Sequence, residues 1–166
     1  MESSLCRRVS ATVSQEFSDV ADAEQITRIV LRLTLAGLLG GLLGFERESR
    51  GKAAGVRTHM LVCMGAAMFV LVSQQAGILQ ADISRVLQGV IAGVGFLGAG
   101  AILKSEDDSR VKGLTTAAGI WLTAAVGVAA GMGRETTAVL STLLALGVLC
   151  AVPLVDRLMG KPRSDA

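Results

Sequence analysis

The sequence predicts an all-α, polytopic transmembrane helix bundle with about five spans. Three observations lead to this fold class. Hydrophobic residues make up 51% of the 166 positions, and 20 glycines add to them. Charged residues reach only 18%, whereas a water-soluble domain carries about 25%. The apolar residues also gather into runs near the length of about 20 residues that a helix needs to cross a bilayer.

Five apolar runs are interpreted as spans. Arg32 lies inside the first run, within a turn of its start, so we expect its side chain to snorkel to the lipid headgroups. Together the runs form one predicted transmembrane domain, residues 26–158. The runs are residues 29–45, 58–78, 86–103, 114–132 and 136–158.

Polar segments lie on either side of this domain. Residues 1–25 are polar, but Val9, Val13, Phe17 and Val20 fall at helical spacing. This segment is therefore either a short helix at the membrane surface or a disordered chain, and the sequence does not indicate its function. Residues 159–166 are interpreted as a short cytoplasmic tail, with no room for a soluble C-terminal domain.

The distribution of Lys and Arg predicts the orientation. With five spans, the loops 45–57 and 104–113 lie on the same side as the C-terminus. Ten basic residues lie there, against Arg28, Arg85 and Arg134 near the other face. Because basic loops stay inside, we expect an outside N-terminus and a cytoplasmic C-terminus. The ten are Arg47, Arg50, Lys52, Arg57, Lys104, Arg110, Lys112, Arg157, Lys161 and Arg163.

Small residues recur at helical spacing within the spans. The segment GVGFLG, residues 93–98, matches a dinucleotide-binding motif, but it has no preceding strand and no acidic residue about 20 positions later. Helix packing is the better interpretation, because small residues let helix backbones approach closely in lipid. We therefore predict a tight bundle and leave a homo-oligomer open. The packing residues are Gly40, Gly44, Gly89, Gly93, Gly100, Ala117 and Ala124.

Polar residues at the rims of the spans are candidate functional residues, because polar groups in a membrane are costly. Thr58 and Thr115 are predicted to be N-caps of their helices. Two helix N-termini beside basic residues favour an anion. The alternative is that the basic residues only anchor the bundle to anionic lipid and fix its orientation. The predicted cytoplasmic face comprises Glu46, Arg47, Arg50, Arg57, Thr58, His59, Thr115 and Thr116.

Composition argues against other function classes. A net charge of +2 and 3% aromatic residues do not fit a nucleic-acid-binding protein. No nucleophile has a partnered base and no carboxylates converge, so we expect no enzyme activity and no cofactor. A metal site is left unknown. The expected partners are the lipid bilayer and another membrane protein complex.

Three long blocks resemble the MgtC/SapB family of bacterial inner-membrane proteins. They read GLLGFERESRGKAAGVRTHMLVCMGAA, RVLQGVIAGVGFLGAGAIL and VKGLTTAAGIWLTAAVGVAAGMG, and with the fainter last helix they cover roughly residues 26–150. The chain departs from longer members, which continue into a soluble C-terminal domain. Some members also have Asn in place of Thr115.

The resemblance implies a multi-pass protein of the bacterial inner membrane. It also implies a regulator that supports adaptation to low magnesium, and survival inside host phagocytes, by acting on other membrane complexes such as the proton-translocating ATP synthase. A magnesium transporter or transport accessory protein is the alternative. A sensor of small anions or lipid headgroups at the cytoplasmic rim is a third hypothesis. A dication favours carboxylate oxygens, and the span interiors hold none.

Overall fold

A computed structural model describes residues 2–16, 22–77, 82–104 and 111–158 of the chain. The chain divides into two units, Met1–Leu31 and Arg32–Ala166, and the boundary lies within helix α2 (Ala23–Ser49). The two units are described separately. The predicted tail, residues 159–166, lies outside the described residues.

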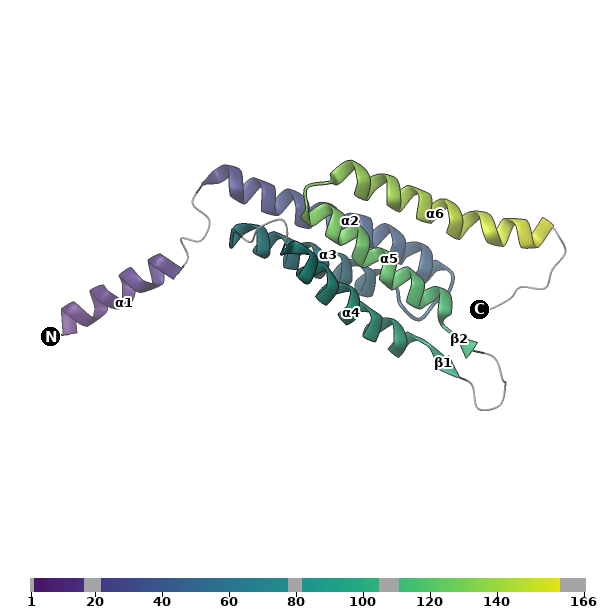
Figure 1. The fold of residues 1–166 in the computed structure, drawn as a ribbon, viewed down its shortest axis with the longest axis horizontal. Helices are drawn as coiled ribbons and strands as arrows, with labels where there is room; N and C mark the ends of the chain where they lie inside the picture. The colour runs from purple at the N-terminus through teal and green to yellow at the C-terminus, as the bar shows by residue number, and fades with distance from the viewer. Residues whose placement is uncertain (1, 17–21, 78–81, 105–110, 159–166) are drawn as a thin grey trace. The chain divides into compact units, whose positions relative to one another are not determined.

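The all-α fold class is confirmed (Figure 1). Each of the five predicted spans corresponds to one helix, although the helix ends differ by a few residues. The helices that follow α1 (Glu2–Glu16) and α2 are α3 (Val56–Gln75), α4 (Ile83–Ala101), α5 (Leu114–Gly131) and α6 (Glu135–Leu158).

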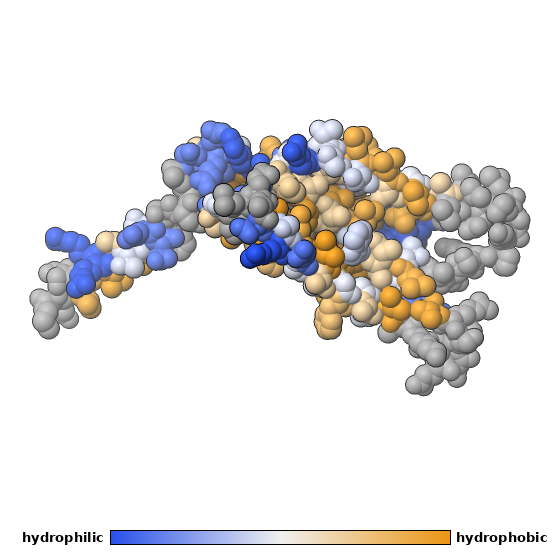
Figure 2. All heavy atoms as spheres, viewed as in Figure 1, coloured by the Kyte–Doolittle hydropathy of each residue, from blue (hydrophilic) through white to orange (hydrophobic). Residues whose placement is uncertain are grey.

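Four helices, α2 to α5, are long and apolar enough to cross a membrane. In α6 the apolar part found within the described residues is Glu135–Ala151, which is shorter. Figure 2 shows one face of the molecule, where apolar residues in orange cover much of the bundle surface. Large side chains such as Phe96, at 81% exposure, and Leu144, at 72%, point outward. In a soluble protein such a surface would aggregate, whereas lipid accepts it.

The first unit contains α1 and the start of α2. The helical alternative for the N-terminal segment is the one observed, since Glu2–Glu16 form α1. Its apolar side chains Leu5, Val9 and Val13 are exposed. Phe17 and Val20 lie outside the described residues. At the start of α2, the Asp22 carboxylate accepts a hydrogen bond from the Gln25 backbone N–H at 2.7 Å, which satisfies one free donor of the first helical turn.

Helix α5 lies at the centre of the second unit, where it contacts α3, α4 and α6. Its contact with α3 is a backbone contact. A Cβ atom added at Gly127 would overlap the backbone of Cys63, and one at Gly131 would overlap Ala67. Glycine at these two positions therefore sets the distance between the helices, and the close approach is stabilised by dispersion.

Helix α2 packs closely on the first half of α3 in the same way. A Cβ at Gly40 would lie 2.6 Å from the His59 carbonyl oxygen, and one at Gly44 would lie 2.6 Å from Val56 Cα. Both glycines are buried, as the packing prediction requires. Around these contacts Ala36, Leu39 and Leu43 join the main apolar cluster with residues of α3, α5 and α6.

Helix α4 turns a different face inward from the one predicted. Val94 and Gly98 are buried, and a Cβ at Gly98 would lie 3.5 Å from Ala117 Cβ on α5. Ala124 of α5 is buried as well. By contrast, a Cβ at Gly89, Gly93 or Gly100 would meet no atom within 4 Å among the described residues. These three glycines therefore pack against no other helix among the described residues, because α4 packs through the adjacent stripe, and their packing against a partner or a second copy stays a prediction.

Arg32 contacts three other helices at one end of the bundle, and the expectation that its guanidinium reaches the headgroups stays a prediction. Its Nη1 donates to Gln74 Oε1 and to the Gly131 carbonyl, each at 3.0 Å. Its Nε lies 3.7 Å from a Glu135 carboxylate oxygen. One side chain thereby links α2, α3, α5 and α6 at this end of the bundle.

A short antiparallel ladder precedes α5. Strand β1 (Leu103–Lys104) pairs with β2 (Val111–Lys112), with Leu103 opposite Lys112. Gly113 then starts α5 with a left-handed φ of 94°, and a Cβ there would overlap the Ala101 carbonyl oxygen. A residue with a side chain would be strained at this point, so the turn from β2 into α5 requires glycine.

We expect Gly127→Ala to lower the free energy of unfolding by about 1–3 kcal/mol, because the new methyl overlaps the Cys63 backbone. The matched control is Gly147→Ala in α6, where a Cβ meets no atom within 4 Å. The measurement is a dodecyl sulfate titration of purified protein in micelles, followed by circular dichroism. Equal unfolding midpoints for the two variants would contradict the backbone contact.

Candidate functional site

A buried charged cluster forms where α2 ends. Glu46 is 9% exposed and Arg47 is 3% exposed, so the two charged side chains lie among the best-covered residues of the helix. Arg50, one turn later, is half-buried. Charges in such a place are costly unless they are paired.

The single carboxylate of this cluster is shared by two guanidinium groups. Arg47 Nε donates to Glu46 Oε2 at 2.5 Å, and its Nη2 lies beside the same oxygen. Arg50 Nε forms an ion pair with Glu46 Oε1, although their alignment does not make a hydrogen bond. The predicted pairing of Glu46 with Arg50 is therefore present. With two positive groups and one negative group, the trio has a net charge of +1.

His59 of α3 lies next to this cluster and is fully buried. Its Nδ1 is 3.0 Å from the Gly55 carbonyl oxygen, which only accepts hydrogen bonds, so Nδ1 is assigned the proton. Its Nε2 has no hydrogen-bond partner among the described residues. That nitrogen faces Gly119 of α5. A Cβ atom added at Gly119 would lie 3.5 Å from His59 Nε2 and 4.0 Å from Arg47 Cδ.

The helix N-termini do not have the predicted caps. Gly55 occupies the N-cap position of α3 and Gly113 that of α5, so the assignment of Thr58 and Thr115 as N-caps is wrong. Helix α3 starts two residues earlier than predicted. Helix α5 starts where predicted, but its N-cap is Gly113 in a left-handed conformation. At α3 the Glu48 carboxylate accepts from the Val56 N–H at 2.8 Å. A side-chain anion therefore already lies at this helix terminus.

The structure brings together only part of the predicted face. Glu46, Arg47, Arg50 and His59 gather where α2 and α3 meet α5, and Thr116 is buried one turn before Gly119. Thr115 is half-buried and contributes no helix cap.

Arg57 and Thr58, two other predicted members of this face, are exposed. Sequence reasoning missed Gly119 and Glu48. Gly119 follows Thr116 by three residues, so both lie on one side of α5. This spacing could have predicted that Gly119 belongs to the site.

The arrangement favours anions over cations. Within the described ranges, no group of three or more His, Cys, Asp or Glu residues is placed to hold a metal ion. The buried carboxylate is already engaged by Arg47 and Arg50. A divalent cation at this position would meet a net positive charge in a medium of low dielectric constant, where repulsion is strong.

Comparison with known proteins assigns the family. A family model described as the MgtC family matches residues 33–158, which is most of the chain. The chain belongs to the MgtC family. No solved structure was found to match it.

Several curated proteins are similar to this MgtC-family chain. The "Putative magnesium transporter YhiD" of Escherichia coli K12 is 43% identical over 140 residues, covering 80% of this chain and 64% of YhiD. "Protein SrpB" of Synechococcus elongatus is 44% identical over 141 residues, 76% of each chain. "Protein MgtC" of Brucella abortus strain 2308 is 46% identical over 127 residues, covering 74% of this chain and 51% of that protein. The chain thus spans less than two thirds of YhiD and about half of this MgtC.

We expect Glu46→Ala to destabilise this MgtC-family protein by about 3–5 kcal/mol, because it leaves the buried Arg47 guanidinium without its partner. Glu24→Ala is the control, since it removes an exposed ion pair with Arg28, and we expect a loss below about 1 kcal/mol. Unfolding midpoints in micelles measure both. Similar losses for the two variants would show that the cluster at Glu46 is not a buried ion pair.

Proposed function

We propose that this protein is a regulatory membrane protein that supports adaptation to low magnesium by acting on another membrane complex. One observation carries the proposal: the buried carboxylate at the end of α2 is neutralised by Arg47 and Arg50, which leaves the cluster with a net positive charge. This site is suited to holding helices in register and to presenting a positive end of the bundle.

Magnesium transport is the alternative function. The printed name of YhiD links that relative to magnesium transport. A transport path for a hydrated dication needs several oxygen ligands, normally including carboxylates that face a cavity. Glu46 fails this requirement in the observed geometry, because Arg47 and Arg50 engage its two oxygens. The arrangement at the site therefore favours regulation over transport.

A regulator of a membrane complex needs a lateral surface within the bilayer. Phe96 is 81% exposed and shares a helical stripe of α4 with Gly100, above which no side chain lies. A protruding ring beside a small residue is a pattern through which membrane helices associate. The resemblance to MgtC makes the proton-translocating ATP synthase the first complex to test, and survival inside phagocytes the first phenotype.

A deletion strain and its parent, both grown in limiting magnesium, test the function. For a regulator that restrains ATP synthesis, we expect the deletion to raise cellular ATP while the initial rate of magnesium uptake stays unchanged. Cellular magnesium content, uptake rate and ATP level are measured in both strains and in the deletion strain carrying the wild-type gene. Lost uptake with lowered magnesium content, and with no rise in ATP, would establish the transport alternative instead.

Purified protein provides a second readout that does not depend on the strain. In vesicles loaded with a magnesium-sensitive dye, we expect no magnesium entry above that of protein-free vesicles, because the positive cluster repels the dication. Entry that increases with the amount of protein would overturn the regulatory proposal.

A further inference from the structure

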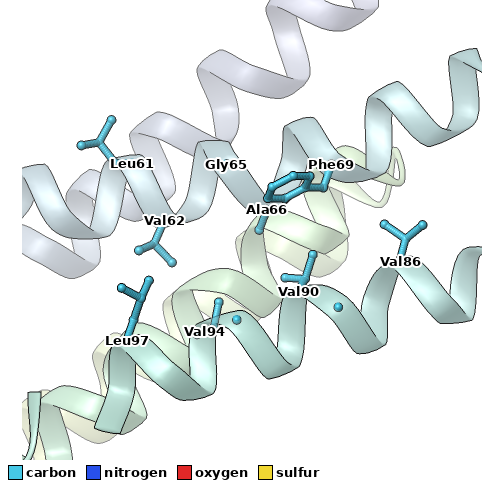
Figure 3. Close-up of a pocket in the computed structure, with 11 residues that line it drawn as sticks. Leu61, Val62, Gly65, Ala66, Phe69, Val86, Val90, Val94 and Leu97 are labelled. Atoms are coloured by element: carbon cyan, nitrogen blue, oxygen red, sulfur yellow. The ribbon is translucent and has the colours of Figure 1, made fainter. Parts of the chain in front are cut away.

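An apolar groove runs between α3 and α4 (Figure 3). It has a volume of about 730 Å³. Leu61, Gly65 and Phe69 of α3 line one wall, and Val86, Gly93 and Leu97 are among the residues of α4 that line the other. All the lining residues are apolar, and Leu61, Phe69 and Leu97 are at least half exposed, so the groove opens sideways toward lipid.

The groove exists because α3 and α4 have glycines where they face each other. Helix α4 packs on α5 through Gly98, whereas its Gly89 and Gly93 line the groove beside α3. A Cβ added at Gly65, Gly89 or Gly93 would meet no atom within 4 Å among the described residues. Gly65 and two of the predicted packing glycines, Gly89 and Gly93, therefore leave space in the groove for an apolar guest.

The length of the groove matches one leaflet of a bilayer. Along α4 it extends from Val86 to Leu97, about 16 Å at about 1.5 Å per residue. One leaflet contributes about half of a hydrocarbon core that is about 30 Å thick.

One end of the groove has an exposed positive charge. Arg57 is exposed and lies one turn before Leu61, so it stands at the end of the groove, beside the face of α3 that lines it. It stands about 6 Å beyond Leu61 along the helix. Unlike Arg47 and Arg50, it has no ion-pair partner among the described residues.

The opposite end of the groove differs. There Arg85, next to Val86, lies 3.8 Å from the Asp82 carboxylate, so its charge is already paired. A negatively charged headgroup is therefore attracted to the Arg57 end, which faces the loop between α2 and α3.

We propose that this groove is a binding site for an anionic phospholipid of the leaflet on the Arg57 side. One acyl chain lies over Gly65, Gly89 and Gly93, and the phosphate is held by the Arg57 guanidinium. The guanidinium matches a phosphate with two parallel N–H donors. This site goes beyond the proposed regulatory function and does not depend on it. It gives the exposed Arg57 a role separate from the buried cluster at Glu46.

Native mass spectrometry of the full-length protein tests the site. The protein is released from micelles that contain equal amounts of phosphatidylglycerol and phosphatidylcholine with identical oleoyl chains. We expect wild-type protein to retain one phosphatidylglycerol. Arg57→Gln should lower the preference for phosphatidylglycerol about fivefold, the worth of one basic residue near an anionic surface. Arg134→Gln, an exposed arginine at the other end of the bundle, should leave it unchanged.

Filling the groove is the second part of the test. Gly93→Leu should abolish retention of the lipid, whereas Gly100→Leu, equally open but outside the groove, should not. Circular dichroism confirms that both variants fold. Unchanged retention in Gly93→Leu, or an unchanged preference in Arg57→Gln, overturns the proposal. A lipid-free dimer that Gly93→Leu converts into a monomer overturns it as well, because the groove is then an interface between copies.

Discussion

The close approach of the α3 and α5 backbones is the contact on which the rest of the bundle depends. Gly127 and Gly131 bring α5 against Cys63 and Ala67, and no larger residue fits at that distance. Once α5 is fixed, Gly119 comes to lie over His59 and Arg47, which closes the polar cluster from above. The site is therefore a by-product of helix packing, and its burial is set by residues one to three turns away.

Much of the fold could be predicted because the membrane limits the choices. A span must be apolar for about 20 residues, so Thr58, Leu114 and Thr136 were placed within a few residues of the observed helix starts. The inward face of α4 could not be predicted, because in lipid all sides of a helix are apolar. Gly93 and Gly98 are equivalent by composition, and only the position of Ala117 on α5 decides which one is buried.

The same reasoning explains the partial success at the site. Charged residues at the end of a span are costly, and this cost identified Glu46, Arg47 and His59. The same cost could not predict that Arg47 is buried and Arg57 exposed, because burial depends on the neighbouring helix and not on local sequence spacing. The N-caps were missed for a similar reason. Sequence rules favour Thr as a cap, whereas here the Glu48 carboxylate reaches the start of α3 from the preceding helix.

The links made by Arg32 have a consequence for the order of assembly in the membrane. Its guanidinium is satisfied by the Gly131 carbonyl, 99 residues further along the chain, and by Glu135. During synthesis at about 5–20 residues per second, the first span therefore waits on the order of 5–20 seconds for these partners. Until then the guanidinium has to stay hydrated near the membrane surface. The first helix thus takes its final depth only after α5 and the start of α6 have been inserted.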